Sequence, residues 1–274
     1  MCIKLAKNRL KARKRFGQNF LQDEMVIADI VGAIDPQADQ HLVEIGPGHG
    51  AITQLLVQTC QRLDIIEVDR DLVPLLRNKL GSYPQLHVHE ADALVFDYVS
   101  LVTEQEKLRV IGNLPYNITT PLLFHLLSQA QYIEDMCFML QLEVVQRICA
   151  QPGSKTYGRL SIMVQYQCEV MQLFSVPPEA FEPVPKVDSA IIYLKPLKQL
   201  SGGDMPIAAL KMIVTQAFSQ RRKTVSNTLK NIVSLTVLED LGIDLKQRPE
   251  TISVAQYVAI TKAWLLERGQ NEAG

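Results

Sequence analysis

The sequence predicts an α/β fold with a doubly wound, mostly parallel sheet, followed by a small all-helical domain. From His41 onward, short apolar runs alternate with helical patterns, as in repeated β-α-β units. A glycine-rich turn at 46–50 joins the first of these runs to a helical pattern, as at the start of a doubly wound sheet. After Ile207 the chain has helical periodicity without strand signals, which predicts the second domain.

The length of the chain allows two hydrophobic cores. Its 274 residues are 47% hydrophobic, which is enough for one large domain and a small one. The expected division is an arm at 1–15, a large domain at 16–200 and a helical domain at 201–274. The Ser-Gly-Gly-Asp stretch at 201–204 is the expected linker.

The composition excludes several classes of protein. No apolar run approaches the ~18 residues of a membrane span, and no apolar segment follows the basic N-terminus as in a secretory signal. A cytoplasmic protein without membrane contact is therefore expected. The 5 cysteines are scattered and lack Cys-x-x-Cys pairing, which indicates reduced thiols and neither disulfides nor a zinc site.

Basic residues are clustered although the net charge is only −1. Arg13, Lys14 and Arg15 end a basic run at the N-terminus, and Arg221, Arg222 and Lys223 form a second cluster. A solvated tail and a phosphate-binding arm are equally compatible with the first cluster. Phosphate binding would make affinity strongly dependent on salt, which distinguishes the two.

The first elements follow the arm. Two aromatic residues flank a glycine and two amides, Gln18 and Asn19, in the stretch 15–21, which has the composition of a docking turn. Asp23 is expected to cap a helix, because an aspartate accepts hydrogen bonds from the first N–H groups of a helix. The apolar face of that helix consists of Val26, Ile27, Ile30 and Val31.

The strongest local signal is the glycine turn. A short buried strand at 42–45 leads into Gly46, Gly48 and Gly50, and a helix is expected at 51–59. Glycines let the backbone approach a ligand closely, and the N–H groups at a helix start favour an electron-rich group. The Gly-x-Gly-x-Gly spacing differs from the pyrophosphate turn of NAD-binding proteins, so a ligand without a pyrophosphate is favoured.

Acidic residues end the next two predicted strands. Glu67 ends the strand 63–68 about 20 residues after the glycines, where a carboxylate binds ribose hydroxyls in doubly wound folds. Asp92 and Ala93 follow a strand at 86–89, where Asp92 can accept from an adenine amino group. The order of these residues predicts a nucleoside site at one edge of the sheet.

The turn at 111–117 has the chemistry to hold a flat amine. Asn113 offers a carbonyl acceptor, and Pro115 biases Leu114 toward an extended conformation that projects its carbonyl. The aromatic face of Tyr116 can stack on a nucleobase. Two acceptors on the two N–H bonds of an exocyclic amine would free the nitrogen lone pair for attack on an electrophilic carbon.

The chain after this turn continues the alternation. The expected elements are a helix at 122–127, a strand at 136–140, a helix at 143–150 and a strand at 190–194. The proline-rich stretch 176–186 predicts an ordered extended loop, in which Phe181 is either a second stacking face or part of the core. His87 and His89 share a strand face, but without a third ligand no metal is expected.

Several motifs together resemble those of the bacterial small-subunit (16S) ribosomal RNA adenine N6,N6-dimethyltransferases, of the rRNA adenine dimethylase family. The resemblance runs in order from residue 11 to Gln256, and the motifs that carry it are at 15–21, 44–50, 113–116, 176–185, 186–190 and 218–224. It implies a class I methyltransferase fold, Rossmann-like with a mostly parallel seven-stranded sheet, and a C-terminal RNA-binding domain. S-adenosylmethionine is the implied donor, and S-adenosylhomocysteine is the implied product.

The implied substrate is 16S rRNA within the immature small subunit. Two adjacent adenosines in its 3′-terminal hairpin loop would each become N6,N6-dimethyladenosine, and a monomer is expected. The implied donor-binding residues are Gln18, Asn19, Leu21, Gly46, Gly48, Gly50, Glu67, Asp92, Ala93 and Asn113. The implied catalytic residues are Asn113, Leu114, Pro115, Tyr116 and Phe181. RNA binding is expected at Arg13, Lys14, Arg15, Arg221, Arg222 and Lys223.

Three other functions are compatible with parts of the pattern. A related dimethylase of large-subunit rRNA would share the glycine turn and the Asn-x-Pro-Tyr core, but the stretches 186–190 and 218–224 favour the small-subunit enzyme. A ribosome-assembly factor would use the same fold mainly to bind RNA. An NAD-dependent oxidoreductase is disfavoured by the glycine spacing.

Overall fold

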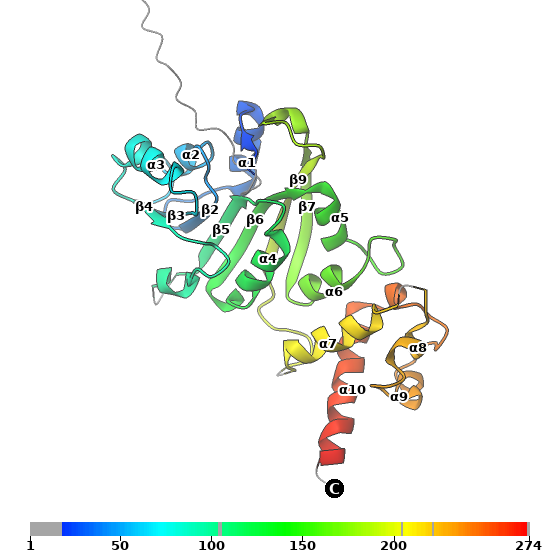
Figure 1. Cartoon of the computed structure of the whole chain (residues 1–274). Helices are drawn as coiled ribbons and strands as arrows, with labels where there is room; N and C mark the ends of the chain where they lie inside the picture. The colour runs from blue at the N-terminus through cyan, green and yellow to red at the C-terminus, as the bar shows by residue number, and fades with distance from the viewer. Residues whose placement is uncertain (1–17, 104–105, 204, 221, 273–274) are drawn as a thin grey trace, which may run out of the picture. The chain divides into compact units, whose positions relative to one another are not determined.

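A computed structural model describes residues 18–103, 106–203, 205–220 and 222–272 (Figure 1). The chain divides into two compact units. The first comprises Met1–Leu142 and Gln172–Pro196, and the second comprises Glu143–Met171 and Leu197–Gly274.

A seven-stranded sheet with strand order β4-β3-β2-β5-β6-β9-β7 forms the first unit, except that residues 168–171 of β7 group with the second unit. The strands are β2 (His41–Ile45), β3 (Arg62–Glu67), β4 (Leu86–Glu90), β5 (Leu108–Asn113), β6 (Ile133–Gln141), β7 (Cys168–Val176) and β9 (Ser189–Pro196). The first five of these pair in parallel, and β9 is antiparallel to β6. The predicted doubly wound, mostly parallel, seven-stranded sheet is therefore confirmed.

Helices cover both faces of this sheet. The helices α1 (Glu24–Ile34), α2 (Thr53–Leu56) and α3 (Leu72–Leu80) share one hydrophobic core with alternate residues of the strands, such as Leu63 and Ile65. The fourth helix, α4 (Thr119–Leu127), lies in front of the opposite face in Figure 1. The strands β2, β3, β5 and β6 are largely buried, which explains why their sequences read as nearly continuous apolar runs.

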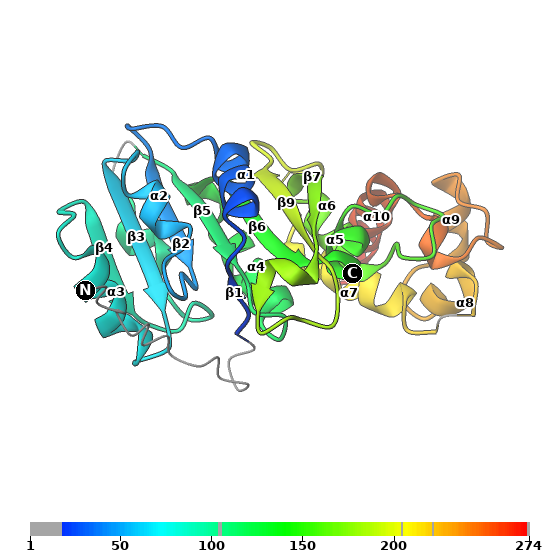
Figure 2. The ribbon, with the colours of Figure 1, turned by 90° about the horizontal axis from the view of Figure 1, so that it is seen from above.

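The amino-terminal part of the unit pairs with a segment far along the chain. The strand β1 (Phe20–Leu21) is antiparallel to β8 (Phe181–Glu182), which follows the 3₁₀ helix η4 (Pro178–Ala180). Figure 2 shows β1 leading into α1. The stretch 176–186 was expected to contain no regular structure, and this expectation is wrong. The prolines occupy positions outside the strand pair, so they remove no hydrogen bond from it.

Other predicted boundaries also needed correction. The helix expected at 51–59 is only the four-residue α2, and turns take up the rest. The strand β7 was missed, because several of its residues are exposed and weaken the apolar signal. Two 3₁₀ helices complete the first unit, η2 (Tyr98–Leu101) and η3 (Ala130–Tyr132).

The second unit is helical. Its elements are α5 (Leu142–Ile148), α6 (Arg159–Gln165), α7 (Ile207–Ala217), α8 (Val225–Leu229), α9 (Leu235–Asp240), the 3₁₀ helix η5 (Pro249–Thr251) and α10 (Val254–Glu272). The helix α7 packs against both α6 and α10. In the division into two units, α6 and the residues of α5 after Leu142 group with the C-terminal helices. No helix in the described part of the chain has the length and apolar character needed to cross a bilayer.

Candidate active site

A cavity lies at the carboxyl ends of the parallel strands in the first unit. Its walls come from residues 18–21, 44–49, 51–52, 66–68, 91–94 and 113–118. In the sheet, β3 and β4 lie on one side of β2, and the next strands along the chain, β5 and β6, lie on its other side. Ligands of doubly wound sheets bind at this reversal of strand order, so the cavity is the expected place for a nucleoside.

Most of the predicted site residues line this cavity. They are Gln18, Asn19, Leu21, Gly46, Gly48, Glu67, Asp92, Ala93, Asn113, Leu114, Pro115 and Tyr116. Gly50 and Phe181 are not among the lining residues. The structure therefore brings together residues from four strand ends and from the segment before α1.

The glycine turn needs its glycines for two different reasons. All three have positive φ, at 67° for Gly46, 56° for Gly48 and 74° for Gly50, where other residues are strained. A Cβ on Gly48 would also come within 3.0 Å of the Phe20 ring, beside the cavity. A Cβ on Gly50 would instead meet side chains of α3. Gly50 therefore shapes the turn and faces away from the cavity.

Residues 18–21, here called the strap, form one wall of the cavity. Gln18 Nε2 donates to Asp69 Oδ2 at 3.0 Å. The Phe20 ring lies against the His49 ring, with centroids 4.1 Å apart. These contacts attach the strap to the loop after β3 and to the glycine turn. Sequence reasoning missed Asp69, whose partner lies 51 positions away.

Glu67 is a buried carboxylate at the end of β3, with a relative exposure of 5%. Burial raises its pKa to about 6, although hydrogen bonds from the backbone N–H groups of Asp69 and Gly48 act in the opposite direction. The N–H of Asp69 lies 2.8 Å from Glu67 Oε1. A carboxylate held this way can accept hydroxyl donors from a ligand in the cavity.

Glu44 is a second buried acid in the wall, and sequence reasoning gave it no role. Burial raises its pKa to about 7, against a hydrogen bond from Thr53. The Thr53 hydroxyl donates to Glu44 Oε2 at 2.6 Å, which ties β2 to α2. In the sequence, the one sign that Glu44 has a special role is its position as an acidic residue within an otherwise apolar buried strand.

Asp92 is exposed at the edge of the cavity after β4. The backbone N–H of Leu94 donates to Asp92 Oδ1 at 2.9 Å, which fixes the carboxylate in a turn. Its second oxygen has the chemistry to accept from an exocyclic amine, as the sequence predicts.

The turn after β5 is fixed at both its side chain and its backbone. Asn113 Nδ2 donates to the backbone oxygen of Asn19 in the strap at 3.2 Å, which leaves its side-chain carbonyl as the acceptor. The N–H of Leu114 donates to Met139 O on β6 at 3.1 Å. The turn is therefore attached to the strap on one side and to the sheet on the other.

Tyr116 lines the cavity, and its phenol reaches the sheet. Its hydroxyl lies 3.2 Å from the hydroxyl of Ser189, the first residue of β9. The sequence placed Ser189 in a family motif without a role, because nothing in the local pattern connects it to a residue 73 positions away.

Phe181 is 3% exposed and belongs to the hydrophobic core beneath α1. Of the two alternatives left open by the sequence, packing in the core is the one that this arrangement supports. Tyr116 lines the cavity and is the aromatic residue of the turn at 113–116.

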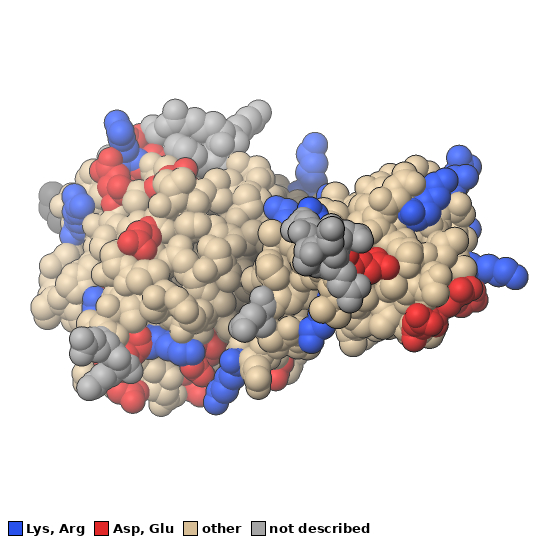
Figure 3. Space-filling view, turned by 90° about the horizontal axis from the view of Figure 1, so that it is seen from below, with Lys and Arg blue, Asp and Glu red and all other residues tan. Residues whose placement is uncertain are grey.

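The predicted RNA-binding residues are only partly described. Arg13, Lys14, Arg15 and Arg221 lie outside the described residues, and Arg222 and Lys223 are exposed in the second unit. On the face drawn in Figure 3, Lys and Arg are dispersed among acidic and uncharged residues. RNA binding by these residues stays a prediction. Among the residues with described positions, no cluster of three or more His, Cys, Asp or Glu side chains is arranged to hold a metal ion.

Comparison with known proteins identifies the family. The model of the ribosomal RNA adenine dimethylase family matches residues 9–264. The chain belongs to this family. Two proteins named ribosomal RNA small subunit methyltransferase A are similar over most of their length. That of Marinomonas sp. (strain MWYL1) is 52% identical over 259 residues, 94% of this chain and 97% of the relative. That of Pseudomonas aeruginosa is 53% identical over 250 residues, 91% and 93% of the two chains.

Solved structures of dimethylases and their relatives have the same fold. A dimethyladenosine transferase from Plasmodium falciparum has a TM-score of 0.76 and 25% identity, and the alignment covers 92% of this chain and 98% of that one. The 23S rRNA methyltransferase ErmE has a TM-score of 0.70 and 26% identity, with coverage of 90% and 99%. The family resemblance and the class I methyltransferase fold inferred from the sequence are confirmed.

Proposed function

We propose that this protein transfers methyl groups from S-adenosylmethionine to N6 of two adjacent adenosines in the 3′-terminal hairpin loop of 16S rRNA, giving N6,N6-dimethyladenosine. The proposal rests on one observation. The residues suited to bind a nucleoside and the turn at 113–116, which is suited to bind an amine, line the same cavity. The small-subunit relatives, at 52% and 53% identity, support the choice of substrate.

The residues of the cavity fit the methyl donor. The buried carboxylate of Glu67 suits the two ribose hydroxyls, and Asp92 suits the adenine amine. Gly46 and Gly48 leave room for the backbone to approach the ligand. When bound, S-adenosylmethionine supplies a methyl group on a positively charged sulfur. No metal is needed for this transfer.

The turn after β5 would act on the target base. Asn113 and Leu114 each accept one N–H of the adenine amine, and Tyr116 stacks on the ring. The nitrogen lone pair then forms a bond to the methyl carbon as the carbon–sulfur bond breaks toward sulfur. The developing positive charge on N6 is stabilised by the two carbonyl dipoles, and the proton leaves to water afterwards. Positioning and charge stabilisation therefore suffice, without a strong base.

The target adenosine must leave its stack to enter the cavity. Unstacking costs a few kcal/mol and is cheaper in a hairpin loop than in a duplex. Basic residues at 13–15 and at 221–223 would bind the surrounding phosphates, which predicts affinity that falls steeply with salt. The same contacts would serve an assembly role within the immature small subunit.

One experiment tests the reaction and the target together. Purified protein is supplied with labelled S-adenosylmethionine and unmodified small ribosomal subunits, with large subunits and free rRNA as controls, and the labelled base is mapped. Paired dimethyladenosines near the 3′ end of small-subunit RNA are expected. Label on the large subunit would move the assignment to the resistance-type relative, and binding without label would leave an RNA-binding assembly factor.

Donor affinity should depend on the ionisation of Glu67. Because its pKa is raised to about 6, the carboxylate gains a proton as the pH falls through that value and loses an acceptor for ribose. Titration calorimetry should show S-adenosylmethionine binding about tenfold more weakly at pH 5 than at pH 7.5. Glu67→Gln should bind weakly at both values, without this pH dependence. An equal affinity of the wild-type protein at both pH values would contradict the role of Glu67.

A further inference from the structure

We infer that Ser189 is a positioning residue, which fixes the ring of Tyr116 and thereby favours the second of the two methyl transfers to each adenosine. The inference rests on the proposed function and deepens it. Ser189 lies outside the cavity lining, and its hydroxyl contacts the proposed base-binding turn through the phenol of Tyr116.

The hydroxyl of Ser189 is held by a rigid part of the sheet. Ser189 is 1% exposed and opens β9, where it pairs with Gln141 on β6. The preceding residue, Asp188, accepts a hydrogen bond from the N–H of Leu142 at 2.9 Å. Backbone pairing on both sides of this position leaves the serine little freedom, so its side chain is a fixed point.

Tyr116 is therefore attached at both of its ends. Near its backbone, the turn is tied to β6 through the N–H of Leu114. At its far end, the phenol meets Ser189 Oγ at 3.2 Å. Without the second attachment, the half-buried ring can rotate about its side-chain torsions and leave the plane that suits stacking. The bond to Ser189 thus determines the plane in which a base is held.

The second transfer depends more on this plane than the first. An unmodified adenine amine offers two N–H donors, one for Asn113 and one for the carbonyl of Leu114. After one methylation only one N–H remains, so one of the two acceptors loses its partner. The stacking face then carries a larger share of the positioning. Loosening Tyr116 should therefore slow the second transfer more than the first.

The test compares Ser189→Ala, Tyr116→Phe and the double variant of the full-length protein on unmodified small subunits. Digested RNA is analysed for N6-monomethyl and N6,N6-dimethyl adenosine over time. In both single variants, the second transfer should slow by about tenfold and the first by less than threefold, within the range of one lost hydrogen bond. Monomethyladenosine should accumulate, while the KM for S-adenosylmethionine changes by less than about twofold.

The double variant shows whether Ser189 acts through Tyr116. Since either single change removes the same hydrogen bond, the double variant should equal each single one. Ser175→Ala on β7, an exposed serine of the same sheet, is the matched control and should retain the wild-type product ratio. Tyr116→Phe keeps the test valid if Ser189→Ala lowers stability, because it removes the bond from the less buried side.

The possible results distinguish a failure of the role of Ser189 from a failure of the proposed methyltransferase function. A wild-type ratio of mono- to dimethyladenosine in Ser189→Ala and Tyr116→Phe would overturn the role of Ser189 and leave the proposed function intact. Additive effects in the double variant would also overturn it, because Ser189 would then act elsewhere. A wild-type protein that methylates no adenine N6 would overturn the proposed function itself.

Discussion

Replacing Asn113 by alanine should lower the rate of methyl transfer by about 10²–10³-fold, the usual cost of removing one preorganised dipole from a developing charge. Asn113 lines the cavity, and its bond to Asn19 O uses the amide nitrogen, which leaves the side-chain carbonyl as the acceptor. Alanine removes this acceptor and also detaches the turn from the strap. Donor binding should therefore weaken but stay measurable, because Glu67 and Asp92 are unchanged.

Single-turnover rates on small subunits measure the loss of methyl transfer, and calorimetry with S-adenosylmethionine measures the weaker donor binding. Asn78→Ala is a suitable control, because Asn78 is an exposed asparagine on α3 outside the cavity. Its rate should match that of the wild-type protein. Near-normal turnover in Asn113→Ala would show that the assigned role is wrong.

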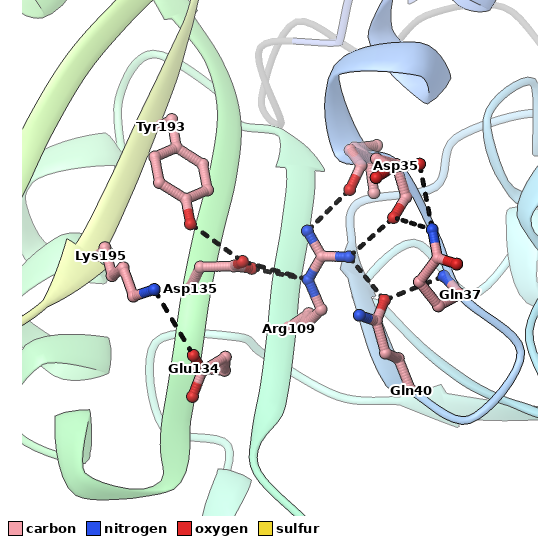
Figure 4. Close-up of polar contacts among 9 residues, drawn as sticks. Asp35, Gln37, Gln40, Arg109, Glu134, Asp135, Tyr193 and Lys195 are labelled. Carbon is pink, nitrogen blue, oxygen red and sulfur yellow. Dashed lines mark hydrogen bonds and ion pairs between the residues drawn. The ribbon is translucent and has the colours of Figure 1, made fainter.

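Replacing Arg109 by alanine should lower the free energy of unfolding by about 3–5 kcal/mol. Figure 4 shows the guanidinium between Asp135 on β6, the carboxyl end of α1 and the side chain of Gln40. Its Nε donates to Asp135 at 2.9 Å, and its two other nitrogens reach the backbone oxygens of Asp35 and Ile34 at 3.2 and 2.7 Å. Alanine would leave the buried Asp135 carboxylate without its counter-charge and would remove the side-chain donor to the Ile34 carbonyl at the end of α1.

Urea unfolding at neutral pH measures this loss. A matched control lies in the same view: Lys195 and Glu134 are paired at 3.7 Å, with side chains 42% and 48% exposed (Figure 4). Lys195→Ala should cost no more than about 1 kcal/mol, because exposed ion pairs are screened by water. Equal losses in the two variants would show that burial of the Arg109 network does not determine its contribution.

Local patterns predicted most of the sheet and of the cavity. Gly46, Glu67, Asp92 and Asn113 each lie at or just after the end of a parallel strand. Parallel strands bring their carboxyl ends to one edge of the sheet, so strand order alone assembles these residues. The contacts that fix these residues were not predictable. The bonds from Gln18 to Asp69 and from Tyr116 to Ser189 join positions 51 and 73 apart, and each partner looks ordinary in its own sequence context.

Burial explains the remaining differences. Arg109 occurs within an apolar strand, and its role depends on Asp135 on the neighbouring strand and on the carboxyl end of α1, which no local pattern reveals. The sequence around Phe181 looks the same whether its ring stacks on a base or packs under a helix. Only the pairing of β8 with β1 places it in the core.

The pairing of β1 with β8 has a consequence for the order of events during synthesis. Gln22 and Glu182, which extend this pair with a hydrogen bond of 2.8 Å, lie 160 positions apart. The strap is among the first parts of the described chain to leave the ribosome, but its partner strand emerges only after the five parallel strands. A nascent chain that ends before β8 already contains the glycine turn, Glu67 and Asn113. Such a chain should bind S-adenosylmethionine weakly, because its strap has no partner strand. We therefore expect donor binding to appear only after β8 has been synthesised.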